Sequence, residues 1–293
     1  MLKTLWKITS ATFTAWWNDD VFRLAAAIAF YTIFSLAPTL LISVGIASLV
    51  FSEEHAKHQI IEEIEKLTGA EGGKVAEQVF NNMIDIRQSP KAILYGLLAV
   101  VIGSTAVFAN LQAALNQIWH VQPKSDRSVL KDLLRVRLRS FCIVLAVGFL
   151  LLVSMVVSAV INGFQALLAE RLEGVSWVWR LLNLSMSFAI ITLLFAMIYK
   201  YLPDVKISWS DVMMGAVITS ILFSIGKFLI GFYLGHVAFG SAYGAAGSFV
   251  VLLIWIYYST LICFFGAEFT QVYASSIGVR IRPQDHAEKT QES

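Results

Sequence analysis

The chain has 293 residues, of which 57% are hydrophobic and 14% are charged, and its formal net charge is +2. A water-soluble protein of this length has too little interior to hide so much apolar surface, so the composition excludes an ordinary soluble domain. The small net charge gives no reason to expect a nucleic-acid partner.

Six continuous apolar stretches are each long enough to cross a bilayer. A helix rises about 1.5 Å per residue, so roughly 20 residues cross a hydrocarbon core about 30 Å thick. The stretches lack the alternation of barrel strands, and we therefore expect an all-α protein with six transmembrane helices in one domain over residues 1–274. The expected spans cover approximately residues 24–51, 92–115, 141–163, 181–199, 212–235 and 247–274.

The first predicted element is an amphipathic helix that precedes the first span. Apolar side chains recur at helical spacing from Leu2 to Trp17 and place three tryptophans on one face. Such a helix is typical of a segment that lies in the headgroup region of a membrane. A first turn that packs against the other helices explains the pattern equally. Within the first span, Pro38 frees a backbone carbonyl, and we expect a kink there.

The longest loop, residues 52–91, contains two apolar stripes separated by glycines and is predicted to form a helical hairpin on the outer side. We interpret its many acidic side chains as a solvated face. His55, His58 and Glu62 have a spacing like that of metal ligands, but such triples on a solvated helix are usually chance. No metal site is therefore predicted. The stripes consist of Ile60, Ile61, Ile64, Leu67, Val75, Val79, Phe80, Met83 and Ile84.

The inner segment of residues 116–140 is rich in basic residues. Such a cluster attracts anionic lipid headgroups at roughly 1 kcal/mol per basic residue close to the surface. The general excess of lysine and arginine in cytoplasmic loops also explains it, and we favour that explanation. The basic residues are Lys124, Arg127, Lys131, Arg135, Arg137 and Arg139.

The distribution of basic residues predicts the orientation of the chain. With the N-terminus inside, the inner segments hold 14 lysines and arginines and the outer segments hold 7, while Lys227 lies within a span. This excess places both termini in the cytoplasm. Residues 275–293 are short and polar, and we predict that they form a disordered cytoplasmic tail.

Two ionisable residues inside the expected spans are the main functional candidates, because a charge at mid-bilayer costs at least about 2.5 kcal/mol. Lys227 either snorkels to the outer headgroups or faces an interior cavity. Glu268 is expected about 10 Å above the inner face, too far from Lys227 in depth for a direct contact. We predict that Glu268 joins a polar cluster at the inner ends of the first two spans. The other expected members are Arg23, Asn110, Gln112 and Asn116.

Four stretches of the chain are distinctive: AAAIAFYTIFSLAP (25–38), GSTAVFANLQAALNQIW (103–119), YLPD (201–204) and SAYGAAGSFVVLLIWIYYSTLICFFGAEFTQVY (241–273). They resemble the YihY/BrkB family of bacterial inner-membrane proteins, which was historically mislabelled as ribonuclease BN. The resemblance covers nearly the whole chain up to about Ala274. It implies a six-helix, multi-pass protein of the bacterial inner membrane without a settled activity, linked in the family to virulence-associated serum resistance and, in one branch, to the movement of lipid precursors.

The residues do not support a ribonuclease. Metal-dependent hydrolysis needs clustered carboxylates or histidines in a water-accessible cleft. The inner loops supply only scattered acidic residues, among them Asp204 and Asp211, and the single histidine His120. We therefore expect no enzymatic activity, no catalytic residue and no cofactor.

Two functions from different classes remain. We favour a transporter or flippase-like protein for an amphiphilic or lipid substrate, because Lys227, the Pro38 kink, the inner polar cluster and the flexible run 240–248 suit a substrate path. The run 240–248 is either a re-entrant segment or a tight outer turn. The alternative function is a non-enzymatic envelope scaffold or virulence-associated assembly partner, whose outer hairpin docks another protein.

Overall fold

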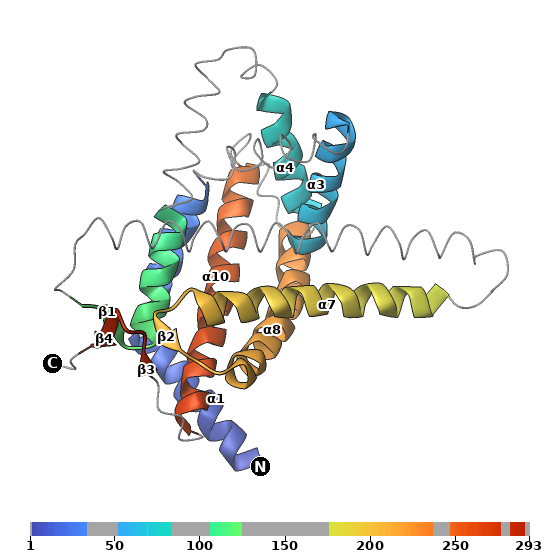
Figure 1. Ribbon diagram of the computed structural model, residues 1–293. Coiled ribbons are helices and arrows are strands. Elements are labelled where there is room, and N and C mark those ends of the chain that lie inside the picture. Colours follow the sequence, from blue (N-terminus) through green and yellow to red (C-terminus); the bar gives the residue numbers. More distant parts are fainter. Residues whose placement is uncertain are drawn as a thin grey trace.

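The computed structural model describes residues 2–33, 52–68, 70–83, 106–124, 176–236, 247–276 and 282–290 (Figure 1). Most of these residues are helical. The helices are α1 (Leu2–Asn18), α3 (Glu53–Thr68), α4 (Ala70–Met83), α7 (Ser176–Tyr201), α8 (Trp209–His236) and α10 (Gly247–Ser276), together with the apolar helix Val21–Ile33 and the helix of residues 106–118. The strands are β1 (Val121–Pro123), β2 (Val205–Lys206), β3 (Arg282–Pro283) and β4 (Ala287–Lys289).

Three of the described helices are long and apolar enough to cross a membrane. They are Trp177–Tyr201 in α7, Trp209–Ile230 in α8 and Val250–Ser276 in α10. They correspond to the last three predicted spans. The structure describes part of the first span as Val21–Ile33 and part of the second as residues 106–118. The third span, Pro38 and most of the run 240–248 lie outside the described residues.

A reciprocal contact between glycine and threonine joins α8 to α10. A Cβ atom added at Gly215 of α8 would lie 1.7 Å from Oγ1 of Thr270, and one added at Gly266 of α10 would lie 1.7 Å from Oγ1 of Thr219. Each threonine hydroxyl also donates a hydrogen bond of 2.7 Å to the carbonyl of the glycine four residues earlier. The missing side chains therefore let the two backbones approach closely, as small residues do between membrane helices.

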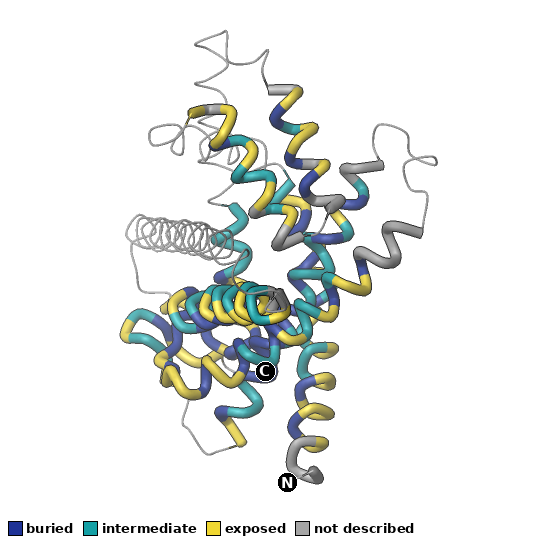
Figure 2. Tube along the Cα trace, turned by 90° about the vertical axis from the view of Figure 1, so that its right-hand side faces the viewer, coloured by how far each residue is buried: buried dark blue, intermediate teal, exposed yellow. Residues whose placement is uncertain are grey.

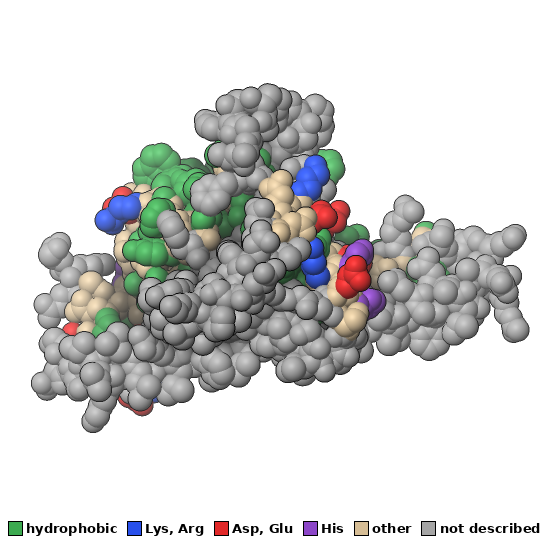
Figure 3. All heavy atoms as spheres, turned by 90° about the horizontal axis from the view of Figure 1, so that it is seen from above, with side chains coloured by type: hydrophobic (Ala, Val, Ile, Leu, Met, Phe, Trp, Pro, Cys, Tyr) green, Lys and Arg blue, Asp and Glu red, His purple; other side chains and the backbone are tan. Residues whose placement is uncertain are grey.

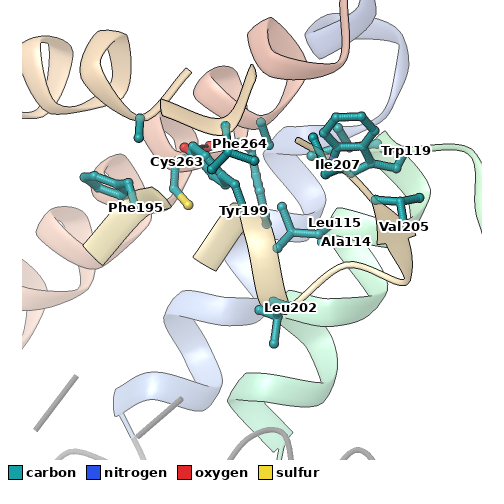
Figure 4. Packing of buried hydrophobic residues seen from close by; sticks show 14 of the residues in the cluster. Ala114, Leu115, Trp119, Phe195, Tyr199, Leu202, Val205, Ile207, Cys263 and Phe264 are labelled. Atoms are coloured by element: carbon teal, nitrogen blue, oxygen red, sulfur yellow. Dashed lines mark hydrogen bonds between the residues drawn. The ribbon is translucent and has the colours of Figure 1, made fainter. Parts of the chain in front are cut away.

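The C-terminal half of α7 packs on this α8–α10 contact. The hydroxyl of the fully buried Tyr199 donates to the carbonyl oxygen of Cys263 at 2.7 Å and lies 2.9 Å from Oγ1 of Thr219. Figure 4 shows Tyr199, Cys263 and Phe264 within the buried apolar core. The first half of α7, which points toward the viewer in Figure 2, is mostly exposed, whereas the buried residues of this helix lie in its second half. Only the C-terminal half of α7 thus contributes to the core.

Helix α1 packs against the other helices on one face and exposes aromatic rings on another. The indole Nε1 of Trp16 donates to the carbonyl oxygen of Leu261 in α10 at 3.3 Å. The exposed rings, at 55–75% exposure, share one stripe of the helix and belong to Trp6, Phe13 and Trp17. One face of α1 thus packs against the other helices through Trp16 in its last turn, whereas the alternative expected this packing at the first turn. The position of the exposed stripe at the membrane interface stays a prediction.

Helices α3 and α4 follow the two predicted stripes and pack against each other. Buried Phe80 and Ala76 of α4 contact the isoleucines of α3, and Nζ of Lys57 donates to Oδ1 of Asn81 at 2.7 Å. Charged and histidine side chains gather over α3 (Figure 3). Figure 1 shows this helix pair at the opposite end of the molecule from the strands and both termini. That the pair is a hairpin on the outer side stays a prediction.

The segment of residues 282–290, which we name the C-terminal strap, is not disordered as we expected. β4 pairs antiparallel with β1, with Val121 opposite Lys289, and β3 pairs antiparallel with β2, with Val205 opposite Pro283. The prediction of a disordered tail is wrong for this segment. Its composition is polar, but its backbone groups are satisfied by strands from two distant parts of the chain, which local composition does not reveal.

Candidate functional site

Asp204 is the centre of a buried polar cluster at the end of α7. The helix ends at Tyr201, and Pro203 cannot donate a backbone hydrogen bond or continue the helix. The chain therefore turns and places Asp204 in the interior, where it is 3% exposed. Its backbone N–H donates to Oδ1 of Asn116 at 2.8 Å. This bond anchors the turn to the helix of residues 106–118.

Side chains from two other segments contact the carboxylate of Asp204. The amides of Gln112 and Asn116 donate to Oδ2 at 3.1 and 2.9 Å. Nε2 of His286 lies 2.8 Å from Oδ1. Gln112 and Asn116 lie four residues apart and share one face of their helix. Both oxygens of the carboxylate are thus partnered, as a buried carboxylate requires. We name these four residues the Asp204 cluster.

The C-terminal strap holds His286 against Asp204. The backbone N–H of Gln284 donates to the carbonyl oxygen of Asp204 at 2.8 Å. Nζ of Lys206 lies 2.8 Å from Oδ1 of the exposed Asp285, and this hydrogen bond holds the pKa of the Asp285 carboxyl below its ordinary value. The Asp204 cluster therefore ties together three segments that lie far apart in the sequence.

Glu268 belongs to a second buried polar site. It lies in α10, is 1% exposed, and interacts with the carboxyl of Asp19 in the turn between α1 and the helix Val21–Ile33. Among the described residues, neither Oε1 of Glu268 nor Oδ2 of Asp19 has a hydrogen-bond donor, and both atoms are buried. The backbone carbonyl of Asp19 accepts a hydrogen bond of 2.9 Å from Nε2 of Gln117. We name Asp19 and Glu268 the carboxyl pair.

The predicted inner polar cluster forms only in part. The structure brings Gln112 and Asn116 together, but around Asp204 instead of Glu268. Sequence reasoning treated Asp204 as one of several scattered acidic residues and His286 as part of a disordered tail. The sequence contained one signal for this cluster, namely two amides on one helix face. If these amides are buried, they need a hydrogen-bond partner near that face.

Arg23 and Asn110, the other predicted members, face elsewhere. Arg23 is exposed, and its Nη2 lies 3.3 Å from Oδ2 of Asp20. Its guanidinium keeps its hydration by staying at the surface. Nδ2 of Asn110 donates to the carbonyl of Ala106 in its own helix at 2.8 Å, a local bond that satisfies the amide without a partner from another helix.

Lys227 is half-buried in α8. Its neighbour Gly226 packs against Tyr258 and Ile262 of α10. Glu268 follows Ile262 by six residues, which is about 9 Å along the helix. This separation agrees with the expectation that the two side chains do not meet.

The histidines of α3 show no sign of a metal site. His55, His58 and Glu62 are exposed. Among the described ranges, no group of three or more histidine, cysteine or acidic side chains has the arrangement of a metal centre. Among the described residues, these two buried polar sites are the candidates for function. The Asp204 cluster has matched donors and acceptors that hold its segments together in this conformation, whereas the carboxyl pair has unfilled acceptors.

Comparisons with known proteins agree with a membrane protein. The family model described as virulence factor BrkB matches residues 12–291. A UPF0761 membrane protein of Tolumonas auensis is 26% identical over 264 residues, covering 87% of this chain and 81% of that protein. A UPF0761 membrane protein of Alteromonas mediterranea is 26% identical over 255 residues, covering 86% of this chain and 83% of that protein.

Some relatives are considerably longer than this chain. A UPF0761 membrane protein of Alkalilimnicola ehrlichii is 26% identical over 265 residues, which cover 88% of this chain but only 56% of that protein. The chain thus spans about half the length of this relative. No solved structure matches the chain.

Proposed function

The chain belongs to the virulence factor BrkB family, and we propose that it is a transporter or flippase-like protein for an amphiphilic or lipid substrate in the cell envelope. The observation that carries this proposal is Glu268, a carboxyl that is 1% exposed within an apolar helix of 27 residues. A buried ionisable group destabilises such a helix unless it is partnered, and an apolar side chain would pack as well. Its presence therefore favours a role in moving a solute.

In the proposed transporter, the hydrogen bonds of the Asp204 cluster close one end of the molecule. A transporter opens alternately at its two ends, so the contacts that close each end must break and form again. The hydrogen bonds of Gln112, Asn116 and His286 to Asp204 are of this kind, because water replaces each of them at little cost once the segments separate. We place this end, with both termini, on the cytoplasmic side of the bacterial inner membrane.

An amphiphilic substrate is favoured by the apolar surfaces that surround the buried polar groups. The exposed faces of α7 and α8 carry large apolar side chains such as Leu184 and Phe228, 68% and 73% exposed. A substrate with an apolar tail stays in contact with such surfaces or with lipid while its headgroup passes between helices. In this proposal the half-buried Lys227 contacts the headgroup, and no chemical conversion takes place.

A vesicle assay tests this function directly. The purified protein is reconstituted into vesicles that contain a fluorescent phospholipid analogue in both leaflets, and an impermeant reductant bleaches the outer leaflet. We expect the protein to expose the inner-leaflet analogue to the reductant, and Glu268→Ala and Lys227→Ala to slow this exchange. Leu253→Ala, on an exposed part of α10, is the matched control. Equal bleaching of vesicles with and without protein would contradict the proposal.

The scaffold remains the second candidate because charged side chains gather over the exposed face of α3 (Figure 3). A partner protein recognises such a surface more readily than lipid does. Under this function, deletion of residues 53–88 abolishes the cellular role, whereas Glu268→Ala acts only through stability. If the protein that lacks residues 53–88 still exchanges the fluorescent lipid in the vesicle assay, the result favours transport over the scaffold function.

A further inference from the structure

The carboxyl pair has a hydrogen-bonding pattern that ionised groups do not satisfy. Glu268 is 1% exposed and Asp19 is half-buried, and their side chains interact. Oε1 of Glu268 and Oδ2 of Asp19 are both buried without a donor among the described residues. An ionised carboxylate only accepts hydrogen bonds, so two carboxylates leave these oxygens unpaired and repel each other.

The charged groups around the carboxyl pair do not relieve this repulsion. Asp19 is the charged group that acts on Glu268, and the basic residue closest to it in the sequence, Arg23, is exposed and bound to Asp20. Among the described residues, the other elements contact this part of α10 through groups that are uncharged at neutral pH. They are Trp16 of α1, Gly215 and Thr219 of α8, and Tyr199 of α7.

We propose that Asp19 and Glu268 together bind one proton. A proton on one carboxyl turns that group into a donor to the other, so the pair gains a hydrogen bond and carries a single negative charge. The half-buried Asp19 gives the proton a route from water to the fully buried Glu268. The exchange is balanced: water supplies the proton, and the pair returns it to water.

This site deepens the proposed function by naming the coupling ion, and only that coupling rests on the proposed function. α1 and the helix Val21–Ile33 flank Asp19, whereas Glu268 belongs to α10. Loss of the proton leaves two charges in contact and drives these elements apart, while its binding draws them together. Proton uptake is thereby linked to the relative position of α10 and the N-terminal helices.

Infrared spectroscopy of the full-length protein in vesicles tests the site without any transport substrate. At neutral pH we expect the carbonyl stretch of a protonated carboxyl in the wild-type protein and no such band in Glu268→Gln. In Asp19→Asn we expect the band to disappear at a lower pH than in the wild-type protein, because the asparagine amide donates to an ionised Glu268. Glu54→Gln, at an exposed position of α3, is the matched control and leaves the band unchanged. No band at neutral pH, or a band that persists in Glu268→Gln, would overturn the proposal.

Folding of the variants is checked in the same samples. The glutamine of Glu268→Gln has the shape of the protonated glutamate and donates to Asp19, so we expect an unchanged thermal transition. If this variant does not fold, the Asp19→Asn titration decides the question, and an unshifted titration would contradict a shared proton.

An imposed pH gradient in the lipid-exchange assay tests the coupling. A present band without lipid exchange leaves the proton site standing and rejects the transport function.

Discussion

Asp204 shows how a single buried carboxylate joins segments that are distant in the sequence. Its Oδ2 accepts hydrogen bonds from two amides of one helix, and its Oδ1 lies beside a histidine of the C-terminal strap. The two amides of Gln112 and Asn116 were recognisable from the sequence, because they lie one helical turn apart near the inner end of a predicted span. Their partner was not, because it lies in a loop, and loop conformation depends on tertiary contacts.

Removal of the Asp204 carboxylate is expected to destabilise the protein strongly. Asp204→Ala leaves the buried amides of Gln112 and Asn116 without their acceptor, and the loss of one partner from such a buried network costs about 3 kcal/mol. Unfolding of the purified protein in mixed micelles with increasing denaturing detergent measures this loss. Asp285→Ala, which removes an exposed carboxylate of the same strap, is the control with little expected effect. Equal stability of the two variants would show that the Asp204 cluster is not a structural tie.

At the scale of elements, α8 and α10 are joined by side chains that sequence analysis did not single out. Both helices contain a glycine followed four residues later by a threonine, Gly215 with Thr219 and Gly266 with Thr270. Apolar composition predicted the two helices, because length and hydropathy are local properties of the chain. It did not predict which faces meet, because small residues also occur at positions that face lipid.

The reciprocal contact predicts a suppressor. Gly215→Ala places a Cβ 1.7 Å from Oγ1 of Thr270, and such overpacking is expected to cost about 1–3 kcal/mol in the unfolding assay. Adding Thr270→Ala removes that oxygen and is expected to restore part of the stability. Thr260→Ala is the matched control, because Thr260 also bonds to its own helix but is not in contact with Gly215. The same rescue by both threonine variants would exclude the proposed contact.

The C-terminal strap predicts a specific cross-link. Gln122 and Glu288 are register partners in β1 and β4, and Nε2 of Gln122 lies 3.2 Å from Oε1 of Glu288. Gln122→Cys combined with Glu288→Cys, with the native cysteines replaced by alanine, is expected to form a disulfide in isolated membranes under mild oxidation. Gln122→Cys with Glu54→Cys is the control, because Figure 1 places α3 at the other end of the molecule. If the cysteines introduced at positions 122 and 288 do not form a disulfide, the result would support the predicted disordered tail.

For the whole molecule, the structure separates two ends with different character. The strands and both termini lie at one end, and α3 and α4 lie at the other (Figure 1). Three of the six predicted spans are described as apolar helices long enough to cross a membrane. The mostly helical fold with apolar spans followed from the sequence because burial in lipid demands continuous apolar helices. The strap did not follow, because its pairing partners are set by tertiary structure.

This arrangement predicts which end faces the cytoplasm. In intact bacterial cells, an impermeant thiol reagent is expected to label Glu54→Cys in α3 but not a cysteine introduced after Ser293, because the excess of basic residues favours the strand end inside. Labelling of both positions after the cells are opened is the control for reactivity. Labelling of the C-terminal cysteine in intact cells would reverse the proposed orientation.

The most direct test of the account is a comparison of lipid exchange and stability in Glu268→Gln. If the buried carboxyl serves transport, this variant unfolds at the wild-type temperature but exchanges the fluorescent lipid at least about tenfold more slowly, the ratio that corresponds to 1.4 kcal/mol. Wild-type exchange by a folded Glu268→Gln protein, or a loss of exchange that only parallels a loss of stability, would contradict the account.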